Sequence, residues 1–343
     1  MTDLASSSPC QETTVDLAII GAGPSGLFAA FEAGLHEMSA AIFDALPRPG
    51  GQLTALYPEK PIYDIPGFPS ILAKELAARL VEQVRPFNPL WCLGQQVERL
   101  ERGEDRLWRV GNGTTLVHAR AVVIAAGVGA FSPRRPVVEG LAAFEEGGAV
   151  HYRIADPTSF EGKRVVILGG GDSAVDWTVM LSGIAAQTHV VHRRASFAAH
   201  PASIGKMERL AAEGKVQIHT PFEIKALEGC CDVLTVMIGN PKERVAIEAD
   251  ALIPMLGFEK SLGPIEGWGI GAGKGGIDVH PTTMATDQPL LYVIGDMASY
   301  PGKLKLILAG FAEAALAVTD AWKQIHPDQA YKHVYSTAKG VAR

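Results

Sequence analysis

Apolar runs separated by glycine-rich turns mark two similar units along the chain. The first unit opens with an apolar strand from Val15 to Ile20, turns at a glycine-rich segment, continues as a helix to about Gly34 and ends in a second strand at Asp44. Short continuous apolar runs bounded by glycine are typical of buried strands in a parallel sheet. The pattern predicts a βαβ unit of a doubly wound α/β fold.

The turn of the first unit carries Gly21, Gly23 and Gly26 in the spacing GxGxxG. Glycines at these positions allow a tight turn, a close approach to a pyrophosphate and close packing of helix on sheet, while the helix N-terminus offers free N–H groups to the phosphates. Asp44 is placed to accept hydrogen bonds from both ribose hydroxyls. We interpret this unit as a site for a nucleotide with a free 2′-hydroxyl, FAD or NAD. The alternative is a glycine turn without a ligand.

The second unit repeats this pattern, with a strand from Arg164 to Leu168, a helix to about Gly183 and a second strand that ends at His192. Its glycine-rich turn contains three small residues, Gly169, Gly171 and Ala174.

Two arginines stand where the first unit has its acidic residue. Arg193 and Arg194 directly follow the second strand of the second unit. A carboxylate there would repel a ribose 2′-phosphate, whereas guanidinium groups bind it through two hydrogen bonds at once. The second site is therefore predicted to prefer NADP(H). The alternative is that both arginines are solvated charges at a strand end.

A third pattern lies near the C-terminus, in LLYVIGDMASYPGKLKLILAGFAEAALAV. It predicts a strand that ends in Gly295 and Asp296, followed by a long amphipathic helix. This arrangement can put Asp296 on a ribityl hydroxyl and a helix N-terminus near the pyrimidine edge of a flavin, where negative charge develops on reduction. Taken alone, Asp296 is more often an ordinary helix cap.

Composition narrows the function classes. The chain has 343 residues, enough for about two domains, and its 47% hydrophobic content is typical of a folded enzyme. A net charge of −6 gives no general attraction for nucleic acid or an anionic membrane. The N-terminal segment lacks the features of a signal peptide, so we expect a cytoplasmic protein without a membrane span. The four cysteines show neither zinc spacing nor CxxC, so no metal site is expected.

Over nearly its whole length the sequence resembles the flavoproteins with two dinucleotide-binding domains and, among them, the thioredoxin-reductase-like ferredoxin–NADP+ reductases of bacteria. The resemblance rests on GAGPSG, PGGQLTALYPEKPIYDIPGFP, VVIAAGVGAFSPR, GGGDSAVDW, VHRR and IGDMASYPGKLKLILAGF. Thioredoxin reductases carry a CxxC pair before the second glycine motif, whereas this chain reads HYRIADPTSFEGK there. Without that dithiol, electrons cannot pass to a disulfide by the usual exchange route.

The resemblance implies an FAD site in which Tyr57 stacks on one face of the isoalloxazine and Val97 lends its backbone to the adenine. Phe131 would pack beside the flavin; Val97 and Phe131 can equally be ordinary core residues. The residues that the resemblance assigns to FAD are the first glycine motif, Asp44, Gln52, Tyr57, Val97, Phe131 and Asp296.

The C-terminal segment YKHVYSTAKGVAR is also a feature of this reductase family and is absent from thioredoxin reductases. The resemblance places Tyr335 over the other flavin face and Thr337 within hydrogen-bonding reach of the reactive edge; the alternative for Tyr335 is a disordered terminus. The chain departs from the family where HRRxxFRA is frequent, because Ala198 replaces the arginine that would help to bind the 2′-phosphate.

These observations predict an α/β fold with two Rossmann-like dinucleotide-binding domains, the NADP domain being inserted in a discontinuous FAD domain. The expected boundaries are 1–127 for the first part of the FAD domain, 128–259 for the NADP domain, and 260–343 for the second part of the FAD domain with a tail that covers the flavin. Glycine- and proline-rich connectors at GVGAFSPRRP and PMLGFEKSLGP support these boundaries and can act as hinges.

The predicted activity is hydride transfer between the nicotinamide and FAD, followed by one-electron exchange with ferredoxin or flavodoxin, without a catalytic acid or base. The resemblance also suggests a homodimer. Two other classes stay open: an NAD(P)H oxidase or a quinone or disulfide reductase, and a non-enzymatic flavin redox sensor. The missing CxxC argues against disulfide reduction, and two intact nucleotide motifs argue against a pure sensor.

Overall fold

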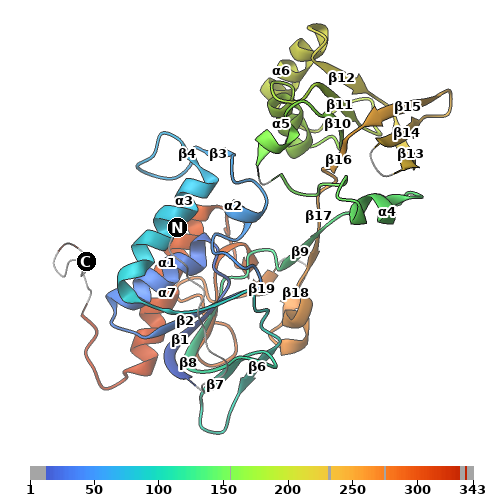
Figure 1. Cartoon of the computed structure of the whole chain (residues 1–343). Helices are drawn as coiled ribbons and strands as arrows, with labels where there is room; N and C mark the ends of the chain where they lie inside the picture. The colour runs from blue at the N-terminus through green and yellow to red at the C-terminus, as the bar shows by residue number, and fades with distance from the viewer. Residues whose placement is uncertain (1–12, 155, 231–232, 274–275, 333–336, 338–343) are drawn as a thin grey trace. The chain divides into compact units, whose positions relative to one another are not determined.

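The computed structural model describes residues 13–154, 156–230, 233–273, 276–332 and 337 (Figure 1). The chain divides into two compact units: unit 1 comprises Met1–Ala130 and Lys260–Arg343, and unit 2 comprises Phe131–Glu259. The chain leaves unit 1 in β9 (Ala130–Pro133) and returns in β17 (Phe258–Ser261), and these two strands pair with each other. Unit 2 is therefore an insertion in a discontinuous unit 1.

Unit 1 is built on a parallel sheet in the order β5-β2-β1-β8-β20, extended on one side by the antiparallel strands β7 and β6. β8 is long enough to pair with β1 on one side and with both β7 and β20 on the other. The strands are β1 (Thr13–Ile20), β2 (Ala40–Asp44), β5 (Leu90–Leu93), β6 (Arg99–Arg102), β7 (Trp108–Gly111), β8 (Leu116–Ile124) and β20 (Leu291–Val293).

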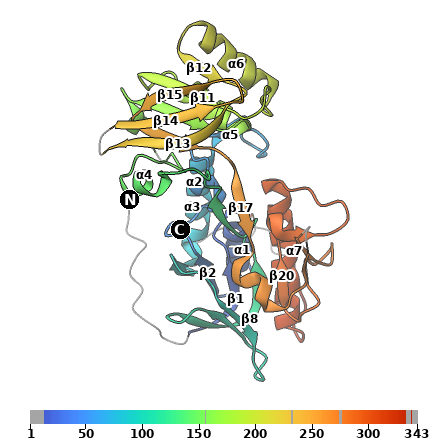
Figure 2. The same cartoon turned by 90° about the vertical axis from the view of Figure 1, so that its right-hand side faces the viewer.

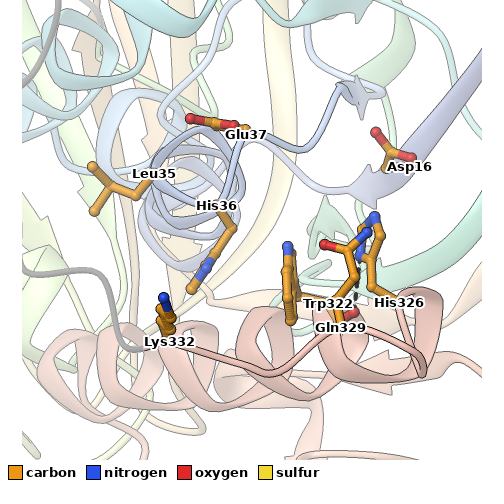
Figure 3. A pocket seen from close by; sticks show the side chains of 8 residues that line it. All are labelled: Asp16, Leu35, His36, Glu37, Trp322, His326, Gln329 and Lys332. Atoms are coloured by element: carbon orange, nitrogen blue, oxygen red, sulfur yellow. Dashed lines mark hydrogen bonds between the residues drawn. The ribbon is translucent and has the colours of Figure 1, made fainter. Parts of the chain in front are cut away.

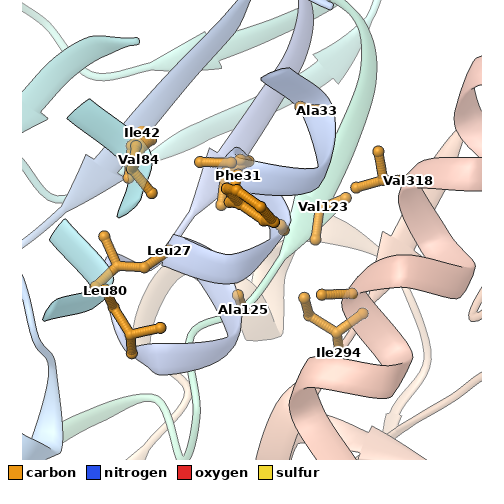
Figure 4. Close-up of a cluster of buried hydrophobic side chains, with 14 of the residues drawn as sticks. Leu27, Phe31, Ala33, Ile42, Leu80, Val84, Val123, Ala125, Ile294 and Val318 are labelled. Atoms are coloured by element: carbon orange, nitrogen blue, oxygen red, sulfur yellow. The ribbon is translucent and has the colours of Figure 1, made fainter. Parts of the chain in front are cut away.

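The core of unit 1 has two layers, because successive strand residues point to opposite faces of the sheet. Leu17 and Ile19 of β1 join the cluster under the helices, whereas Ala18 and Ile20 join the cluster under the antiparallel strands. Figure 4 shows side chains of the first cluster where α1 meets its neighbours. The helices that pack there are α1 (Pro24–Leu35), α3 (Ala73–Val84) and α7 (Ile307–Ile325).

Unit 2 is built on a second parallel sheet in the order β12-β11-β10-β16. Val165 and Ile167 of β10 pack on the side of the helices, while Val166 and Leu168 pack against an antiparallel sheet of β13, β14 and β15 (Figure 2). The elements are β10 (Arg164–Leu168), α5 (Asp172–Leu181), β11 (Gln187–Val191), α6 (Pro201–Ala212), β12 (Val216–His219), β13 (Glu223–Cys230), β14 (Val233–Gly239), β15 (Arg244–Ala249) and β16 (Ala251–Pro254).

Short elements complete the two units. The short helices and strands are α2 (Gln52–Ala55), β3 (Pro61–Ile62), β4 (Ile71–Leu72), α4 (Leu141–Glu146), β18 (Ala272–Gly273), β19 (Gly276–Asp278) and β21 (Ala298–Ser299). The 3₁₀ turns are η1 (Arg85–Phe87), η2 (Pro157–Phe160), η3 (Gly263–Trp268) and η4 (Gly295–Met297). In the part of the chain that the structure describes, no helix has both the length and the apolar character needed to cross a bilayer.

The predicted fold class, α/β with two Rossmann-like domains, is confirmed. Both βαβ units occur where the apolar pattern predicts them. The predicted end of the last strand is wrong: β20 ends at Val293, before Gly295 and Asp296. The chain leaves the sheet there because Gly295 has a φ of +72° and begins a 3₁₀ turn.

Candidate functional site

The glycine turn of unit 1 joins β1 to α1 and leaves no room for a side chain at Gly21 or Gly26. Gly21 has a φ of +113°, and a Cβ there would lie 2.4 Å from the carbonyl oxygen of Ala125. The N-cap residue of α1, Gly23, has no side chain to satisfy the first N–H groups of the helix, and Pro24 occupies the first turn. Gly26 packs the helix directly on the turn. The helix N-terminus is thus arranged as an anion site of the kind that binds a pyrophosphate.

Two further loops of unit 1 meet this turn. The N–H of Gly50 donates to the carbonyl oxygen of Ala22 at 2.8 Å, and a Cβ on Gly51 would lie 3.0 Å from the Cα of Gly23. The amide of Gln52 lies next to Gly127, since a Cβ on Gly127 would be 3.3 Å from its Nε2. The structure therefore brings Gln52 together with the first glycine motif.

Asp44 ends β2 beside the same turn. Its Oδ2 accepts from the N–H of Ala22 at 2.7 Å, and its Oδ1 accepts from the N–H of Leu46 at 2.8 Å. Burial raises the pKa of this carboxyl, and the two backbone hydrogen bonds oppose that rise. Each carboxylate oxygen can accept more than one hydrogen bond, so the group can still receive ribose hydroxyls.

Asp296 and Tyr57 lie close enough to interact electrostatically. Burial raises the pKa of Tyr57, and the negative charges of Asp296 and Asp64 raise it further. Tyr57 is half-buried against the core cluster under the helices. Asp296 follows Gly295 in η4. The structure therefore brings Asp296 and Tyr57 into one region of unit 1, although they are far apart along the chain, and their contacts with FAD stay predictions.

The positions of four other residues expected at the flavin do not test their contacts with FAD. Val97 is buried in the second core cluster of unit 1, and Phe131 lies in β9. Thr337 is exposed, and Tyr335 lies outside the described residues. Their expected contacts with FAD stay predictions.

The glycine turn of unit 2 has the same design as the first. Gly169 donates its N–H to the carbonyl oxygen of Val191 at 3.0 Å, as Gly21 does to that of Phe43 at 2.7 Å. A Cβ on Gly169 would lie 2.4 Å from the carbonyl oxygen of Met255 and 2.9 Å from the Cβ of Ala174. Gly171 is the N-cap of α5 and offers no side-chain cap. This helix N-terminus is a second candidate for phosphate binding.

Arg193 and Arg194 follow β11 at the end of unit 2 that carries this turn. Both side chains are exposed, and neither forms a hydrogen bond or ion pair with another residue that the structure describes. The ring of the preceding residue, His192, packs on Gly170 of the turn, because a Cβ on Gly170 would be 2.2 Å from its Cε1. The two guanidinium groups are thus available to a phosphate of a ligand at the turn.

Ala198 lies against the same turn through its backbone. Its N–H donates to the carbonyl oxygen of Gly170 at 2.7 Å, and it pairs with Gly171 in an isolated bridge. The side chain of Ala198 is exposed. A longer basic residue at this position would start beside the phosphate site, so the departure from the family pattern falls at the candidate site itself.

A separate pocket of about 290 Å³ lies at the other end of α1 (Figure 3). Helix α1 is about 18 Å long, so this pocket is distinct from the glycine turn at its N-terminus. His326 lies within 3.1 Å of the carbonyl oxygen of Trp322. The lining residues are Asp16, Leu35, His36, Glu37, Trp322, His326, Gln329 and Lys332.

Two observations on the described residues concern metal and thiol chemistry. No group of three or more His, Cys, Asp or Glu side chains among them is arranged to hold a metal ion. Cys92 is buried in β5, and burial raises the pKa of its thiol to about 11. A thiol with this pKa is not a nucleophile near neutral pH.

Sequence reasoning missed several residues that shape the unit 1 site. Ser25 contacts both Gly295 and Gly310, and Glu313 accepts a hydrogen bond from the N–H of Gly295. The sequence could have indicated Glu313, because it is a charged residue among the small apolar residues that form the buried face of α7. A carboxylate on such a stripe needs a specific partner.

Comparison with known proteins gives consistent results. A family model for pyridine nucleotide-disulphide oxidoreductases matches residues 15–320. The ferredoxin–NADP reductase of Rhodospirillum rubrum is 49% identical over 333 residues, which cover 95% of this chain and 96% of that protein. The ferredoxin–NADP reductase of Paramagnetospirillum magneticum is 48% identical over 332 residues, which cover 96% of this chain and 98% of that protein.

The fold is also similar to solved structures. The thioredoxin reductase of T. acidophilum matches with a TM-score of 0.75 and 22% identity, covering 92% of this chain and 99% of that one. The thioredoxin reductase of Lactococcus lactis matches with a TM-score of 0.73 and 22% identity, covering 91% of this chain and 99% of that one. At this identity the likeness concerns the fold alone.

Proposed function

The chain belongs to the pyridine nucleotide-disulphide oxidoreductase family and, within it, to the ferredoxin–NADP reductases, and on this premise we propose that it transfers electrons between NADPH and ferredoxin or flavodoxin through a bound FAD. The protein is an enzyme, a flavin-dependent oxidoreductase. The assignment of each nucleotide to a unit, and of each residue to a role, is part of the proposal.

One difference between the two units carries this assignment. Each unit has a glycine turn at a helix N-terminus, but the second strand ends in the carboxylate of Asp44 in unit 1 and is followed by Arg193 and Arg194 in unit 2. A carboxylate suits free ribose hydroxyls, and guanidinium groups suit a 2′-phosphate. Unit 1 therefore binds FAD, and unit 2 binds NADP(H).

The arrangement of loops around the glycine turn of unit 1 supports FAD binding there. The tight approach of Gly51 to Gly23 leaves the helix N-terminus free of side chains, where the pyrophosphate would bind. Asp44 would hold the adenosine ribose, Asp296 the ribityl chain and Gln52 the isoalloxazine. Tyr57 would stack on one flavin face, with Tyr335 and Thr337 at the other.

FAD held by these residues would supply the chemistry, which is acceptance of two electrons as a hydride and their release one at a time. The residues of the chain bind and orient the two nucleotides and exclude water, and no side chain is required as a catalytic acid or base. A disulfide-reductase route is disfavoured, because the chain has no CxxC and its Cys92 thiol is buried.

The proposed partner is an acidic one-electron carrier. From Gln329 to Arg343 the sequence contains Lys332, Lys339 and Arg343 and no Asp or Glu, although the chain as a whole has a net charge of −6. A local basic segment beside the flavin would steer an acidic ferredoxin toward it. We further propose that the enzyme is a cytoplasmic homodimer, as the family resemblance suggests.

The experiment that tests this function is NADPH-dependent reduction of cytochrome c, measured with and without added ferredoxin. We expect the purified protein to carry non-covalent FAD and the rate to depend on ferredoxin. Release of FMN, or no flavin after reconstitution, would falsify the FAD site. A cytochrome c rate that ferredoxin does not raise, together with rapid reduction of quinones or oxygen by NADPH, would instead favour an oxidase or quinone reductase.

A further inference from the structure

The turn that carries Asp296 is held from behind by α7. The N–H of Gly295 donates to Oε2 of Glu313 at 2.7 Å, and this hydrogen bond is buried. Gly295 has a φ of +72°, a region that favours glycine, so its N–H points away from the sheet and needs a partner of its own. Glu313 provides that partner and thereby sets the position of the residue that follows, Asp296.

Glu313 is itself fully enclosed, with 2% of its surface exposed. Its Oε1 accepts from the hydroxyl of Tyr300 at 2.6 Å and forms an ion pair with Nζ of Lys303, whose side chain is 7% exposed. Burial, and then the hydrogen bond to Glu313, raise the pKa of Tyr300 to about 12, so the phenol stays a donor. A buried carboxylate with three donors is a fixed anchor, because each lost donor would leave its charge undercompensated.

The anchor also reaches the first glycine motif. Gly310, one helical turn before Glu313, leaves room for Ser25 of α1: a Cβ on Gly310 would lie 2.1 Å from the Oγ of Ser25 and 3.6 Å from the Cα of Gly295. A Cβ on Gly295 would lie 3.1 Å from the same Oγ. Helix α7 therefore packs against both the first turn of α1 and the Gly295 turn. A shift of α7 would move these two segments, which are the ones proposed to bind FAD.

We propose that Glu313 is a positioning residue for FAD, which fixes the Gly295–Asp296 turn through the N–H of Gly295 while Lys303 balances its charge. The inference rests on the proposed function, because it assumes that FAD binds at this end of unit 1. The Glu313–Lys303 pair adds no net charge to the site, so it changes the electrostatic potential there less than a single buried charge would. Removing one partner alone leaves a buried charge beside the flavin.

The test uses Glu313→Gln, Lys303→Met and the double variant, each measured for the dissociation constant of FAD and for the midpoint potential of the bound flavin. Lys305→Met is the matched control, because Lys305 is exposed two residues away. We expect each single variant to weaken FAD binding at least about tenfold. We expect the double variant to recover most of that loss, since the amide still accepts from Gly295 and no charge is left unpaired.

The midpoint potential separates positioning from general stability. Glu313→Gln leaves an unpaired positive charge, which stabilises the reduced flavin and raises the potential. Lys303→Met leaves an unpaired negative charge and lowers it. The double variant and Lys305→Met should stay near the wild-type potential. A purely structural role would instead lower the melting temperature of the variants without opposite shifts in potential.

Wild-type affinity and potential in Glu313→Gln, or shifts of the same sign in both single variants, would overturn the inference while leaving the proposed function intact. A wild-type protein that binds no FAD would overturn the proposed function, and the inference with it. If Glu313→Gln does not fold, Lys303→Met and the double variant carry the same comparison. Tyr300→Phe, which removes one donor from Oε1, should then give a smaller loss of FAD affinity than Lys303→Met.

Discussion

Gly26 and Gly21 approach so closely that a Cβ on Gly26 would lie 1.8 Å from the carbonyl oxygen of Gly21. We therefore expect Gly26→Ala to push α1 away from the glycine turn and to weaken FAD binding at least about tenfold, since overpacking of this kind costs roughly 1–3 kcal/mol. Flavin retained after gel filtration measures the effect. Gly113→Ala is the control, because open space surrounds Gly113. Full flavin content in Gly26→Ala would contradict the assignment.

Arg193 and Arg194 are exposed beside the second glycine turn. Replacing both by alanine should raise the KM for NADPH by tenfold or more and leave the KM for NADH nearly unchanged, because a hydrogen bond to a charged group contributes about 1.5–3 kcal/mol and only NADPH has the 2′-phosphate. Steady-state kinetics with both nucleotides check this, with Arg209→Ala on α6 as the control. Equal losses for NADPH and NADH would show that the arginines do not bind that phosphate.

Ala198 offers the complementary gain of function. Its backbone is fixed on Gly170, so Ala198→Arg adds a guanidinium group at the phosphate site without disturbing the turn. We expect a several-fold lower KM for NADPH, with no gain for NADH. Ala198→Gln, which adds length without charge, is the control. The same improvement in both variants would mean that packing, and not charge, is responsible.

A pair of histidines, the buried His189 of β11 and the half-buried His219 of β12, predicts how the stability of unit 2 depends on pH. The rings of His189 and His219 lie nearly parallel, with Nδ1 and Nε2 3.1 Å apart. Burial, and then the charge of His219, lowers the pKa of His189 to about 4, and burial lowers the pKa of His219. Between pH 6.5 and about pH 4 the unfolded chain binds more protons at these histidines than the folded chain does. The contribution of the neutral pair to the free energy of unfolding is therefore complete above pH 6.5 and is lost as the pH falls toward 4.

Melting temperatures measured from pH 7.5 to pH 4.5 test this dependence. Each unit by which the native pKa lies below its unfolded value is worth about 1.4 kcal/mol. We expect His189→Leu with His219→Leu to flatten the acid-induced decrease, whereas His280→Gln, which changes an exposed histidine, should not. A decrease of the same steepness in the double variant would mean that other groups control it.

The segment after Lys332 is predicted to act on electron transfer and not on FAD retention. Truncation after Lys332 keeps the packing of Tyr331 on Trp322, whose ring centroids lie 5.5 Å apart, and removes Tyr335 and Thr337. We expect FAD to stay bound, the rate of flavin reduction by NADPH in stopped flow to change, and ferredoxin reduction to weaken most at low salt. Wild-type rates at all ionic strengths would remove Tyr335 and Thr337 from the site.

The two glycine turns could be predicted from the sequence, because the residues that determine each turn are close together along the chain. The Gly21 and Gly169 turns follow from residues within one βαβ unit, and the structure has both where the glycines are. The early end of β20 could not be predicted in this way. The Gly295 turn that ends the strand is bound by Glu313, which lies 18 positions further along the chain and accepts from the N–H of Gly295.

The same distinction holds for the candidate site. The positions of Asp44, at the end of a strand, and of Arg193, just after one, could be predicted from the apolar pattern of the strands. The close contacts of Gly51 with Gly23, and of Ser25 with Gly310, exist only once distant loops have met, so no sequence period indicates them. Lys303 is one of two lysines in PGKLKL, and only the structure distinguishes its buried side chain from the exposed one of Lys305.

The insertion of unit 2 between β8 and β20 also sets the order in which the chain can fold on the ribosome. β8 ends at Ile124, and β20, which pairs with it, begins at Leu291. At about 5–20 residues per second, synthesis of the intervening chain takes on the order of ten seconds. Unit 2, which ends at Glu259, is synthesised in full within that interval, while the nascent unit 1 still exposes the strand edge and helix face that β20 and α7 later cover. Unit 1 therefore begins to be synthesised before unit 2 but completes its fold after it.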